Sequence, residues 1–363
     1  MEKHVVSFKI ESFRGIKNLE LAGLKEINIL TGDNNSGKTS VLEVINYLSG
    51  LDSLRNLAFS TTRSMRQSLR TELSWFERIN YLFPIDEEKS NIKYSFCSQK
   101  GDFFITINKD NYFEMLPERE VRKMQGFRDS SAKDLSQDEM IDVENIKLDF
   151  IINNETVKTQ NVSEFGSIRS EVIRKKAFDT VFITPFRHTF NDIYLTDVLN
   201  NVNLYQEMLE VLQEFDEEII GINVDSKGKT YRKKYMILSK NHKEAIPLEL
   251  YGDGMKKTIL LMSAVIAAKN GILLLDEFET AIHTSAMDKI FAWILNTCMK
   301  LNVQLFITSH SKEAIEKVLK CCPNLSDSIN LYTLFKKNNN TLVRTLSCDE
   351  AIEAIDKFGL EVR

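Results

Sequence analysis

INILTGDNNSGKTS, residues 27–40, is the stretch that decides the fold. The run INIL predicts a buried strand, and a helical pattern over residues 40–48 follows the loop. Between them, residues 32–39 match GxxxxGK(S/T), in which glycines let backbone N–H groups curl around a phosphate at a helix N-terminus. A chance glycine turn rarely has both flanks right, so we expect a phosphate-binding loop. Its candidate contacts are Gly32, Asn34, Asn35, Ser36, Gly37, Lys38, Thr39 and Ser40.

Two side chains of this loop suit a nucleotide with its metal ion. Lys38 supplies a positive charge for the β- and γ-phosphates, and Thr39 offers a hydroxyl to Mg²⁺. A second apolar strand, GILLLDE at 271–277, ends in two carboxylates. Near a phosphate loop, Asp276 would hold Mg²⁺ through water and Glu277 would act as general base toward the attacking water. Taken alone, the pair could be a solvated acidic turn after a buried strand.

A third apolar strand, VQLFITSH at 303–310, ends in a polar triplet. His310 could hydrogen-bond the γ-phosphate or the attacking water, although a lone histidine at a strand end is more often structural. Its position about 33 residues after Glu277 favours a catalytic role when the motifs are taken together.

Residues 250–257, LYGDGMKK, open the helix that precedes the Asp276 strand. Glycines at a helix N-terminus leave backbone N–H groups unobstructed, which makes Gly252, Asp253 and Gly254 a second candidate anion cradle. Alone, the same residues would be only a turn and a helix cap.

The pattern of strands and helices divides the chain into a core and an insertion. In the last third of the chain, helical segments alternate with short apolar strands, which is typical of a parallel α/β sheet. We therefore expect residues 1–50 and 250–363 to be two halves of one ATP-binding core sheet. Residues 51–249 would form inserted β and helical lobes, with helical patterns over 51–82 and 197–220.

Composition limits the class of protein. The chain has 363 residues, is 43% hydrophobic and carries a formal net charge of −5, which fits a folded protein and argues against wholesale coating of nucleic acid. Its 5 cysteines have no CxxC spacing, as expected of reduced thiols. The N-terminus MEKHVVSFKI lacks the apolar core of a signal peptide, and the longest uncharged apolar run, 258–268, is about half a bilayer span. We expect a cytoplasmic protein without a membrane partner.

In chain order, the phosphate loop, the glycine-containing helix start, the Asp-Glu strand and the histidine resemble the head of ABC-type ATPases. With SFRGIKN at 12–18 and DEFETAIH at 276–283, they resemble the OLD-like (overcoming-lysogenization-defect) ATPases of the AAA_15 and AAA_21 type, which belong with RecF and SMC heads. The resemblance covers only the two ends of the chain. It implies an α/β fold, that of an ABC-type P-loop ATPase head with a mixed, mainly parallel core sheet, an antiparallel β lobe and an inserted helical lobe. It also implies that the protein hydrolyses ATP with Mg²⁺.

The resemblance also implies a head-to-tail homodimer, or a higher homo-oligomer. In such heads the signature loop of one subunit, here Gly252–Gly254, closes on the γ-phosphate held by the other. The usual signature serine is replaced by Gly252, so backbone N–H groups and Lys256 would do its work. Arg14 matches an arginine that reaches the nucleotide in related heads, the alternative being a surface arginine.

Two further segments are implied by the resemblance. Residues 279–283 would form the loop that crosses the dimer seam. The glutamine that usually links Mg²⁺ to the lobes is missing from ITPFR at 183–187. Either Thr184 or Arg187 substitutes for it, or the coupling differs.

The chain has no Asp-x-Asp pair and about 50 residues after His310, so we expect no TOPRIM nuclease domain of the OLD type. The resemblance then implies a nucleotide switch that controls a separate effector, a nuclease or toxin, in a bacterial anti-phage defence module, with residues 51–178 as the docking surface. The alternative is a RecF-like DNA-repair ATPase that clamps nucleic acid, while a transporter subunit is disfavoured by the missing glutamine. The candidate DNA-binding strip, which could also be a solvated helix face, is Arg63, Arg66, Arg70 and Arg78.

Overall fold

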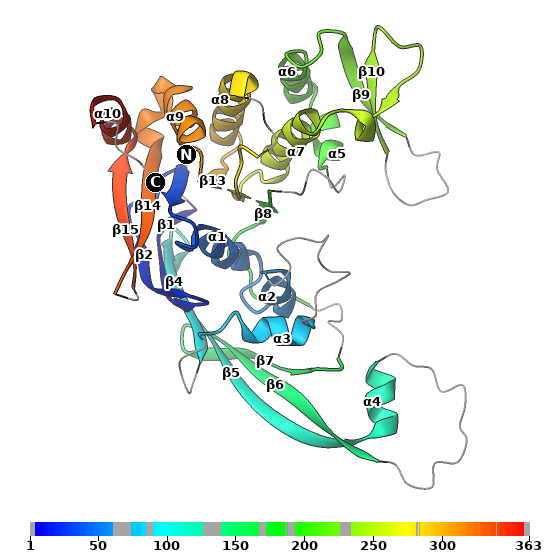
Figure 1. Cartoon of the computed structure of the whole chain (residues 1–363), viewed down its shortest axis with the longest axis vertical. Helices are drawn as coiled ribbons and strands as arrows, with labels where there is room; N and C mark the ends of the chain where they lie inside the picture. Colours follow the sequence, from blue (N-terminus) through cyan, green and yellow to red (C-terminus); the bar gives the residue numbers. More distant parts are fainter. Residues whose placement is uncertain are drawn as a thin grey trace.

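The computed structural model describes residues 4–60, 74–84, 90–125, 139–166, 172–185, 187, 193–225, 234–280, 282, 284–338 and 340–358. Within these residues the strands form a six-stranded mixed sheet, a six-stranded antiparallel sheet and a three-stranded sheet (Figure 1).

The mixed sheet has the strand order β15-β14-β3-β13-β12-β8. Neighbours from β14 to β8 are parallel, and β15 pairs antiparallel with β14 at the edge. β3, β12 and β13 are buried at every position, which explains their apolar runs without alternation. The expected α/β class with a mixed, mainly parallel core sheet is confirmed. The strands are β3 (Ile27–Gly32), β8 (Thr180–Ile183), β12 (Ile272–Leu275), β13 (Gln304–Thr308), β14 (Ile329–Lys337) and β15 (Asn340–Ser347).

Alternate residues of these strands serve two hydrophobic cores, one on each face of the mixed sheet. In β12, Leu273 and Leu275 join the core made with α7, α8 and α9, whereas Ile272 and Leu274 join the core that contains α1 and the antiparallel sheet. The period-2 geometry of a strand divides its side chains in this way. The helices are α1 (Lys38–Asn46), α7 (Asp253–Ala267), α8 (Thr284–Lys300), α9 (Lys312–Lys320) and α10 (Cys348–Phe358).

The antiparallel sheet has the order β2-β1-β4-β5-β6-β7, and its edge strand β2 contacts β15 of the mixed sheet. The strands β5 and β6 continue beyond the sheet as a two-stranded ribbon, with α4 (Glu118–Met124) at its far end (Figure 1). The short helices α2 (Leu54–Ser60) and α3 (Trp75–Asn80) lie between α1 and β4 in the chain. The strands are β1 (Val5–Phe13), β2 (Ile16–Leu21), β4 (Asn91–Ser98), β5 (Gly101–Pro117), β6 (Met140–Ile152) and β7 (Glu155–Ser163).

A third unit packs against α7. It contains the sheet β11-β10-β9 and the helices α5 (Leu195–Leu199) and α6 (Val202–Leu212). The helical pattern over 197–220 was wrong as one helix, because α6 starts at a new cap, where the Asn201 side chain accepts from the backbone N–H of Leu204, and the chain turns into a strand at Ile219. The three strands are β9 (Ile219–Asp225), β10 (Lys234–Ser239) and β11 (Ile246–Pro247).

The division into 1–50 plus 250–363 and 51–249 stays a prediction, but the sheets do not follow its limits. β8 comes from inside 51–249 and pairs with β12 in the mixed sheet, while β1 and β2, from the first 50 residues, belong to the antiparallel sheet. Which sheet a strand joins is decided by pairing with strands that are distant in sequence, and the local pattern of residues does not predict that pairing.

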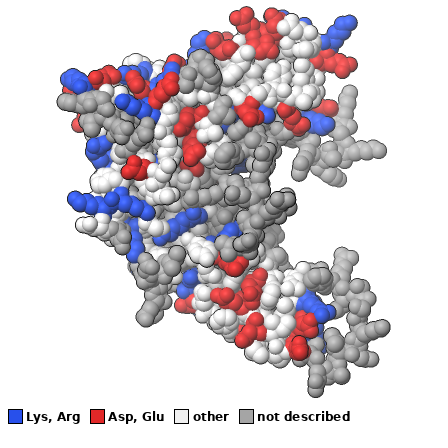
Figure 2. All heavy atoms as spheres, in the orientation of Figure 1, with Lys and Arg blue, Asp and Glu red and all other residues white. Residues whose placement is uncertain are grey.

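Charge is unevenly spread over the face in Figure 2. Acidic side chains gather near α6 and the turn that follows it, where Glu207, Glu210, Glu214 and the run Asp216–Glu218 lie. Among the described residues, no helix is both long and apolar enough to cross a membrane. A cytoplasmic location stays a prediction.

Candidate functional site

The phosphate loop joins β3 to α1 through backbone that glycine adopts most easily. φ is 134° at Gly32 and 107° at Gly37. A Cβ on Gly32 would lie 2.1 Å from the carbonyl oxygen of Leu334, and one on Gly37 would lie 3.1 Å from the side chain of Ile16. Both positions therefore require glycine, for conformation and for space. Asn35 also has a positive φ, 63°, which asparagine tolerates better than most residues.

Lys38 lies inside this loop. Its side chain is 5% exposed, and Nζ donates to the carbonyl oxygens of Gly32 at 2.7 Å and Asp33 at 2.9 Å. Burial lowers the pKa of Lys38, and the nearby carboxylates of Asp276 and Asp33 oppose that effect. The ammonium group is thus held at the start of α1, beside the acidic end of β12.

Asp276 is brought to the loop by the parallel pairing of β3, β13 and β12. Both of its carboxylate oxygens lie 3.1 Å from Thr39 Oγ1, and Thr308 Oγ1 donates to it at 2.6 Å. Asp276 is only 5% exposed. A hydroxyl and a carboxylate side by side are hard oxygen donors of the kind that Mg²⁺ prefers, so these residues fit the metal ion that the sequence predicted.

Glu277 adopts an unusual backbone conformation next to Asp276. Its φ is 45°, in the left-handed region, which costs a non-glycine residue on the order of 1 kcal/mol. Its N–H donates to Thr308 Oγ1 at 2.9 Å, and its Oε1 lies 3.9 Å from His310 Nε2. Burial raises the pKa of Glu277, and the negative charge of Asp276 adds to this effect. A raised pKa suits a carboxylate that accepts a proton near neutral pH.

The signature loop lies on the surface of the single chain. Gly252 and Asp253 are exposed, and the nearby Leu250 is 76% exposed. Among the described residues, apart from the two chain neighbours of Gly252, no atom lies within 4 Å of a Cβ placed on it. Gly252 is the N-cap of α7, so the first backbone N–H groups of that helix begin here. Lys256 forms an ion pair with Asp253 at 2.7 Å, which places its charge beside the loop.

Arg14 is held against its own chain. Its φ is 51°, Nη2 donates to the carbonyl oxygen of Ser60 at 2.6 Å, and Nη2 lies 3.3 Å from Oε2 of Glu43 on α1. Glu43 is 2% exposed, so the pair is largely shielded from water. Arg14 is therefore bound to the helix that starts at the phosphate loop. Its contact with a nucleotide stays a prediction.

Comparison with known families agrees with this geometry. Residues 27–316 match the AAA_21 family model, described as "AAA domain, putative AbiEii toxin, Type IV TA system". The chain belongs to this family. The matched range contains the phosphate loop, the signature loop, the Asp276–Glu277 pair and His310, and it leaves out Arg14.

Individual relatives place this AAA_21 protein among ABC, SMC and RecF ATPases. It is 25% identical over 333 residues to an ATP/GTP phosphatase of Helicobacter pylori, and the alignment covers 86% of this chain and 86% of the phosphatase. It is 24% identical over 380 residues to RecF of Rickettsia typhi, which covers 85% of this chain and 95% of RecF. A solved SMC head bound to the C-winged helix domain of ScpA covers 97% of this chain and 100% of that one, with a TM-score of 0.51 and 11% identity, a likeness of fold alone. The chain is an ATPase of the ABC/SMC/RecF type.

The strand end where a glutamine was expected lies directly beside Asp276 in the ATPase. Leu275 pairs with Ile183, and the N–H of Asp276 donates to the carbonyl oxygen of Ile183 at 2.9 Å. Arg187 is engaged elsewhere, since it donates to the Phe182 carbonyl at 2.7 Å and to the Tyr194 hydroxyl at 2.9 Å. Thr184, the other candidate, directly follows Ile183 in the chain. Whether it replaces the glutamine stays a prediction.

Two charged residues to which the sequence analysis gave no role in hydrolysis lie at the same strand ends. One of them, Glu279, was predicted as the first residue of the seam loop. Lys257, on α7, is 0% exposed, and its Nζ donates to the Pro185 carbonyl at 3.2 Å. Glu279, in the turn after β12, accepts hydrogen bonds from the segment that contains His310. The signal available for Lys257 was its position at the start of an apolar helical run, TILLMSAV, where a lysine has little polar surface to occupy.

Other predicted features lie partly outside the described residues. Arg63, Arg66 and Arg70 of the basic strip fall in the undescribed range 61–73, and Arg78 is on α3. In the predicted seam loop, positions 281 and 283 are likewise outside the described residues.

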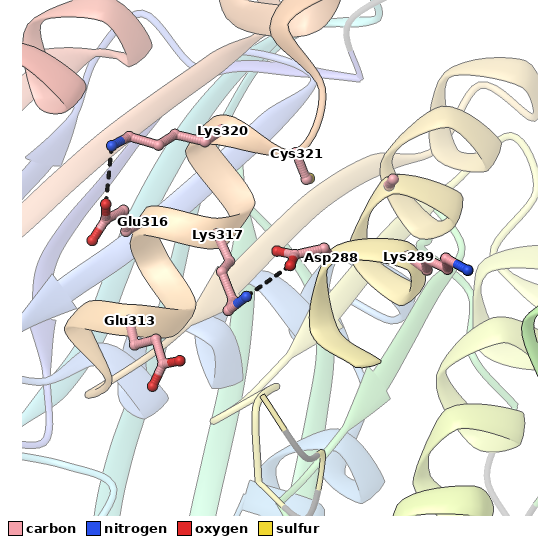
Figure 3. Close-up of a pocket in the computed structure, with 8 residues that line it drawn as sticks. Asp288, Lys289, Glu313, Glu316, Lys317, Lys320 and Cys321 are labelled. Atoms are coloured by element: carbon pink, nitrogen blue, oxygen red, sulfur yellow. Dashed lines mark hydrogen bonds and ion pairs between the residues drawn. The ribbon is translucent and has the colours of Figure 1, made fainter. Parts of the chain in front are cut away.

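A pocket of about 550 Å³ lies apart from this site, between α8 and α9 (Figure 3). Four of its charged residues are paired within the chain, Lys317 with Asp288 at 2.8 Å and Lys320 with Glu316 at 2.9 Å. Burial raises the pKa of the Cys321 thiol at its edge, so this sulfur is a poor nucleophile. The pocket has no feature of a nucleotide site.

Proposed function

We propose that this ATPase binds ATP with Mg²⁺ and acts as a dimeric nucleotide switch that controls a separate effector. The observation that carries the proposal is that the two parts of an ATP site have different surroundings in one chain. Lys38, Thr39, Asp276 and Glu277 converge on one end of the mixed sheet, whereas the signature loop is exposed. An exposed anion cradle is what a composite site needs from a partner subunit.

The residues at the sheet end divide the work. Thr39 and Asp276 would hold Mg²⁺, which when bound supplies charge neutralisation at the phosphates. Lys38 and the N–H groups of the loop would bind the phosphates. Glu277 would accept the proton of the attacking water, and His310, at 3.9 Å from it, would orient that water or the γ-phosphate.

Gly254→Arg tests the composite site. A large side chain at the signature loop should block the approach of a second subunit's nucleotide while leaving the phosphate loop unchanged. Binding of one nucleotide per chain should survive and hydrolysis should fail. Mixing with Lys38→Ala should restore at most one intact site in each mixed dimer. Glu244→Arg, at an exposed position before β11, is the matched control. Full activity of Gly254→Arg by itself would contradict the dimeric site.

Control of an effector is supported by two observations. The family description connects such AAA domains with toxin–antitoxin systems, which contain a second component. The β5–β6 ribbon, within the expected docking region 51–178, exposes Phe113 at 70%, Met115 at 53% and Met140 at 51%, and exposed apolar side chains of this kind suit a protein partner. The OLD-like subtype and a role in anti-phage defence are part of this proposal.

The test is to purify the chain by itself and incubate it with Mg²⁺ or Mn²⁺, ATP, and plasmid, linear and single-stranded DNA or RNA. We expect ATP hydrolysis without cleavage. Cleavage that follows the protein through purification and disappears on substitution of Asp216, Glu217 and Glu218, the acidic run after α6, would overturn the regulator proposal.

A RecF-like DNA clamp is the second candidate, favoured by the alignment with Rickettsia typhi RecF over 85% of the chain. It predicts DNA binding that requires ATP and weakens steeply with salt, since contacts with phosphates release counterions. Fluorescence anisotropy with labelled duplex DNA at several salt concentrations, with and without ATP, separates the candidates. Saturable ATP-dependent binding would favour the clamp.

A further inference from the structure

Glu279 fixes the backbone of the segment that carries His310. Its Oε1 accepts from Ser309 Oγ at 2.8 Å, from the N–H of His310 at 3.2 Å and from the N–H of Ser311 at 3.3 Å. Hydrogen bonds to a carboxylate are stronger than those between neutral groups. One carboxylate oxygen therefore ties the turn after β12 to the junction of β13 and α9.

The imidazole of His310 has little else to hold it. Its side chain is 39% exposed, and among the residues that the structure describes its only charged neighbour within ion-pair range is Glu277, at 3.9 Å. The place of the ring thus follows from the place of its backbone. Because two of the three donors to Glu279 are backbone N–H groups at His310 and Ser311, a loss of the carboxylate would release that backbone directly.

The charge of the buried Lys257 interacts with this carboxylate. The side chain is 0% exposed, and Glu279 is the charge that most favours its protonated form, followed by Asp276 and Glu277. Oε2 of Glu279 is buried and has no hydrogen-bond partner in the described part of the chain. A buried carboxylate oxygen needs a neighbouring positive charge, and Lys257 supplies one from α7, the helix that begins at the signature loop.

We propose that Glu279 is a positioning residue that places His310 for ATP hydrolysis. The inference rests on the proposed hydrolytic role of His310. Glu279 touches neither nucleotide nor water in this scheme. It acts through the backbone of residues 309–311.

The experiment compares Glu279→Ala and Glu279→Gln with Glu313→Ala, an exposed carboxylate in the first turn of α9. Each variant is measured for kcat, KM and nucleotide affinity, alone and combined with His310→Ala. We expect Glu279→Ala to lower kcat by about 10- to 100-fold, the effect of misplacing a catalytic group, with KM and affinity within about twofold. Glu279→Gln keeps an oxygen acceptor and should retain most of the activity. In the His310→Ala background, Glu279→Ala should cost less than about twofold, because the group it positions is gone.

A second readout needs no turnover. The side-chain NMR signal of His310, assigned by its loss in His310→Ala, should shift in nucleotide-free Glu279→Ala and stay in place in Glu313→Ala. If the wild type fails to hydrolyse ATP, the proposed function falls and this signal alone decides the inference. An unshifted signal overturns it. The inference is also overturned if the losses of kcat caused by Glu279→Ala and His310→Ala are independent, so that the double variant shows their full product. It is overturned as well if kcat does not depend on His310.

Discussion

The buried ammonium group of Lys257 should make the stability of this ATPase depend on pH in the alkaline range. Burial lowers the pKa of Lys257 from 10.5 to about 8 in the folded chain, while the unfolded chain keeps the ordinary value. Between about pH 8 and pH 10.5 the unfolded state therefore binds one more proton than the folded state at this residue. Because stability rises with pH wherever the unfolded state binds more protons, the wild type should gain stability over this interval.

The magnitude follows from the same values. Lowering the pKa from 10.5 to about 8 corresponds to about 3 kcal/mol of unfolding free energy, absent below pH 8 and complete near pH 10.5. Lys257→Met has a similar length, no charge and no titration, so it should lack this rise. The difference in unfolding free energy between wild type and Lys257→Met should thus shift toward the wild type by about 3 kcal/mol as the pH increases.

Urea unfolding of the nucleotide-free protein at half-unit steps from pH 7 to pH 10.5 measures this difference. Lys269→Met, at an exposed position just after α7, is the matched control and should track the wild type throughout. Comparing variants at each pH removes the titration of all other groups. A difference between wild type and Lys257→Met that stays flat over the whole interval would refute the reasoning, since Lys257 would then titrate alike in both states.

Three substitutions at the strand ends have separable outcomes. Lys38→Ala should nearly abolish ATP binding, because the loop loses the cation that faces the β- and γ-phosphates, and a fluorescent-nucleotide titration near wild-type affinity would refute the loop assignment. Glu277→Gln should bind ATP normally but turn it over on the order of 10²-fold more slowly, since the amide cannot accept the proton, and hydrolysis at the normal rate in a phosphate-release assay would remove Glu277 from the mechanism. Thr39→Val should raise the Mg²⁺ concentration needed for half-maximal nucleotide binding while leaving the fold intact by circular dichroism, and an unchanged Mg²⁺ dependence would exclude Thr39 as a ligand.

The parts of the site that could be predicted are those whose chemistry is local in sequence. GxxxxGK(S/T) between a strand and a helix needs only its own residues, and the structure has β3, a loop with positive φ at Gly32 and Gly37, and α1 in that order. Asp276 could be added because parallel strands end at one edge of a sheet. That edge brings Asp276 within 3.1 Å of Thr39 across 237 positions of sequence.

The parts that could not be predicted depend on pairing and burial. Nothing in the sequence of residues 178–186, FDTVFITPF, shows that β8 pairs with β12. Lys256 and Lys257 are adjacent and alike in sequence, yet one forms an ion pair at the surface with Asp253 and the other is fully buried. Helical geometry turns them about 100° apart, and only the packed α7 decides which of them points to the core.

Because Lys257 rather than Lys256 is buried, positive charges from both faces of the mixed sheet act on one group of carboxylates. Lys38 comes from α1 on one face and Lys257 from α7 on the other, and the charges of both interact with the same three carboxylates, Asp276, Glu277 and Glu279. Three negative charges within four residues repel one another. A buried lysine lowers stability, so its charge is best explained by what it does for this cluster. The two lysines offset this repulsion before ATP and Mg²⁺ arrive, and we expect Lys38 then to exchange its loop carbonyls for phosphate oxygens, while Lys257 stays buried in α7.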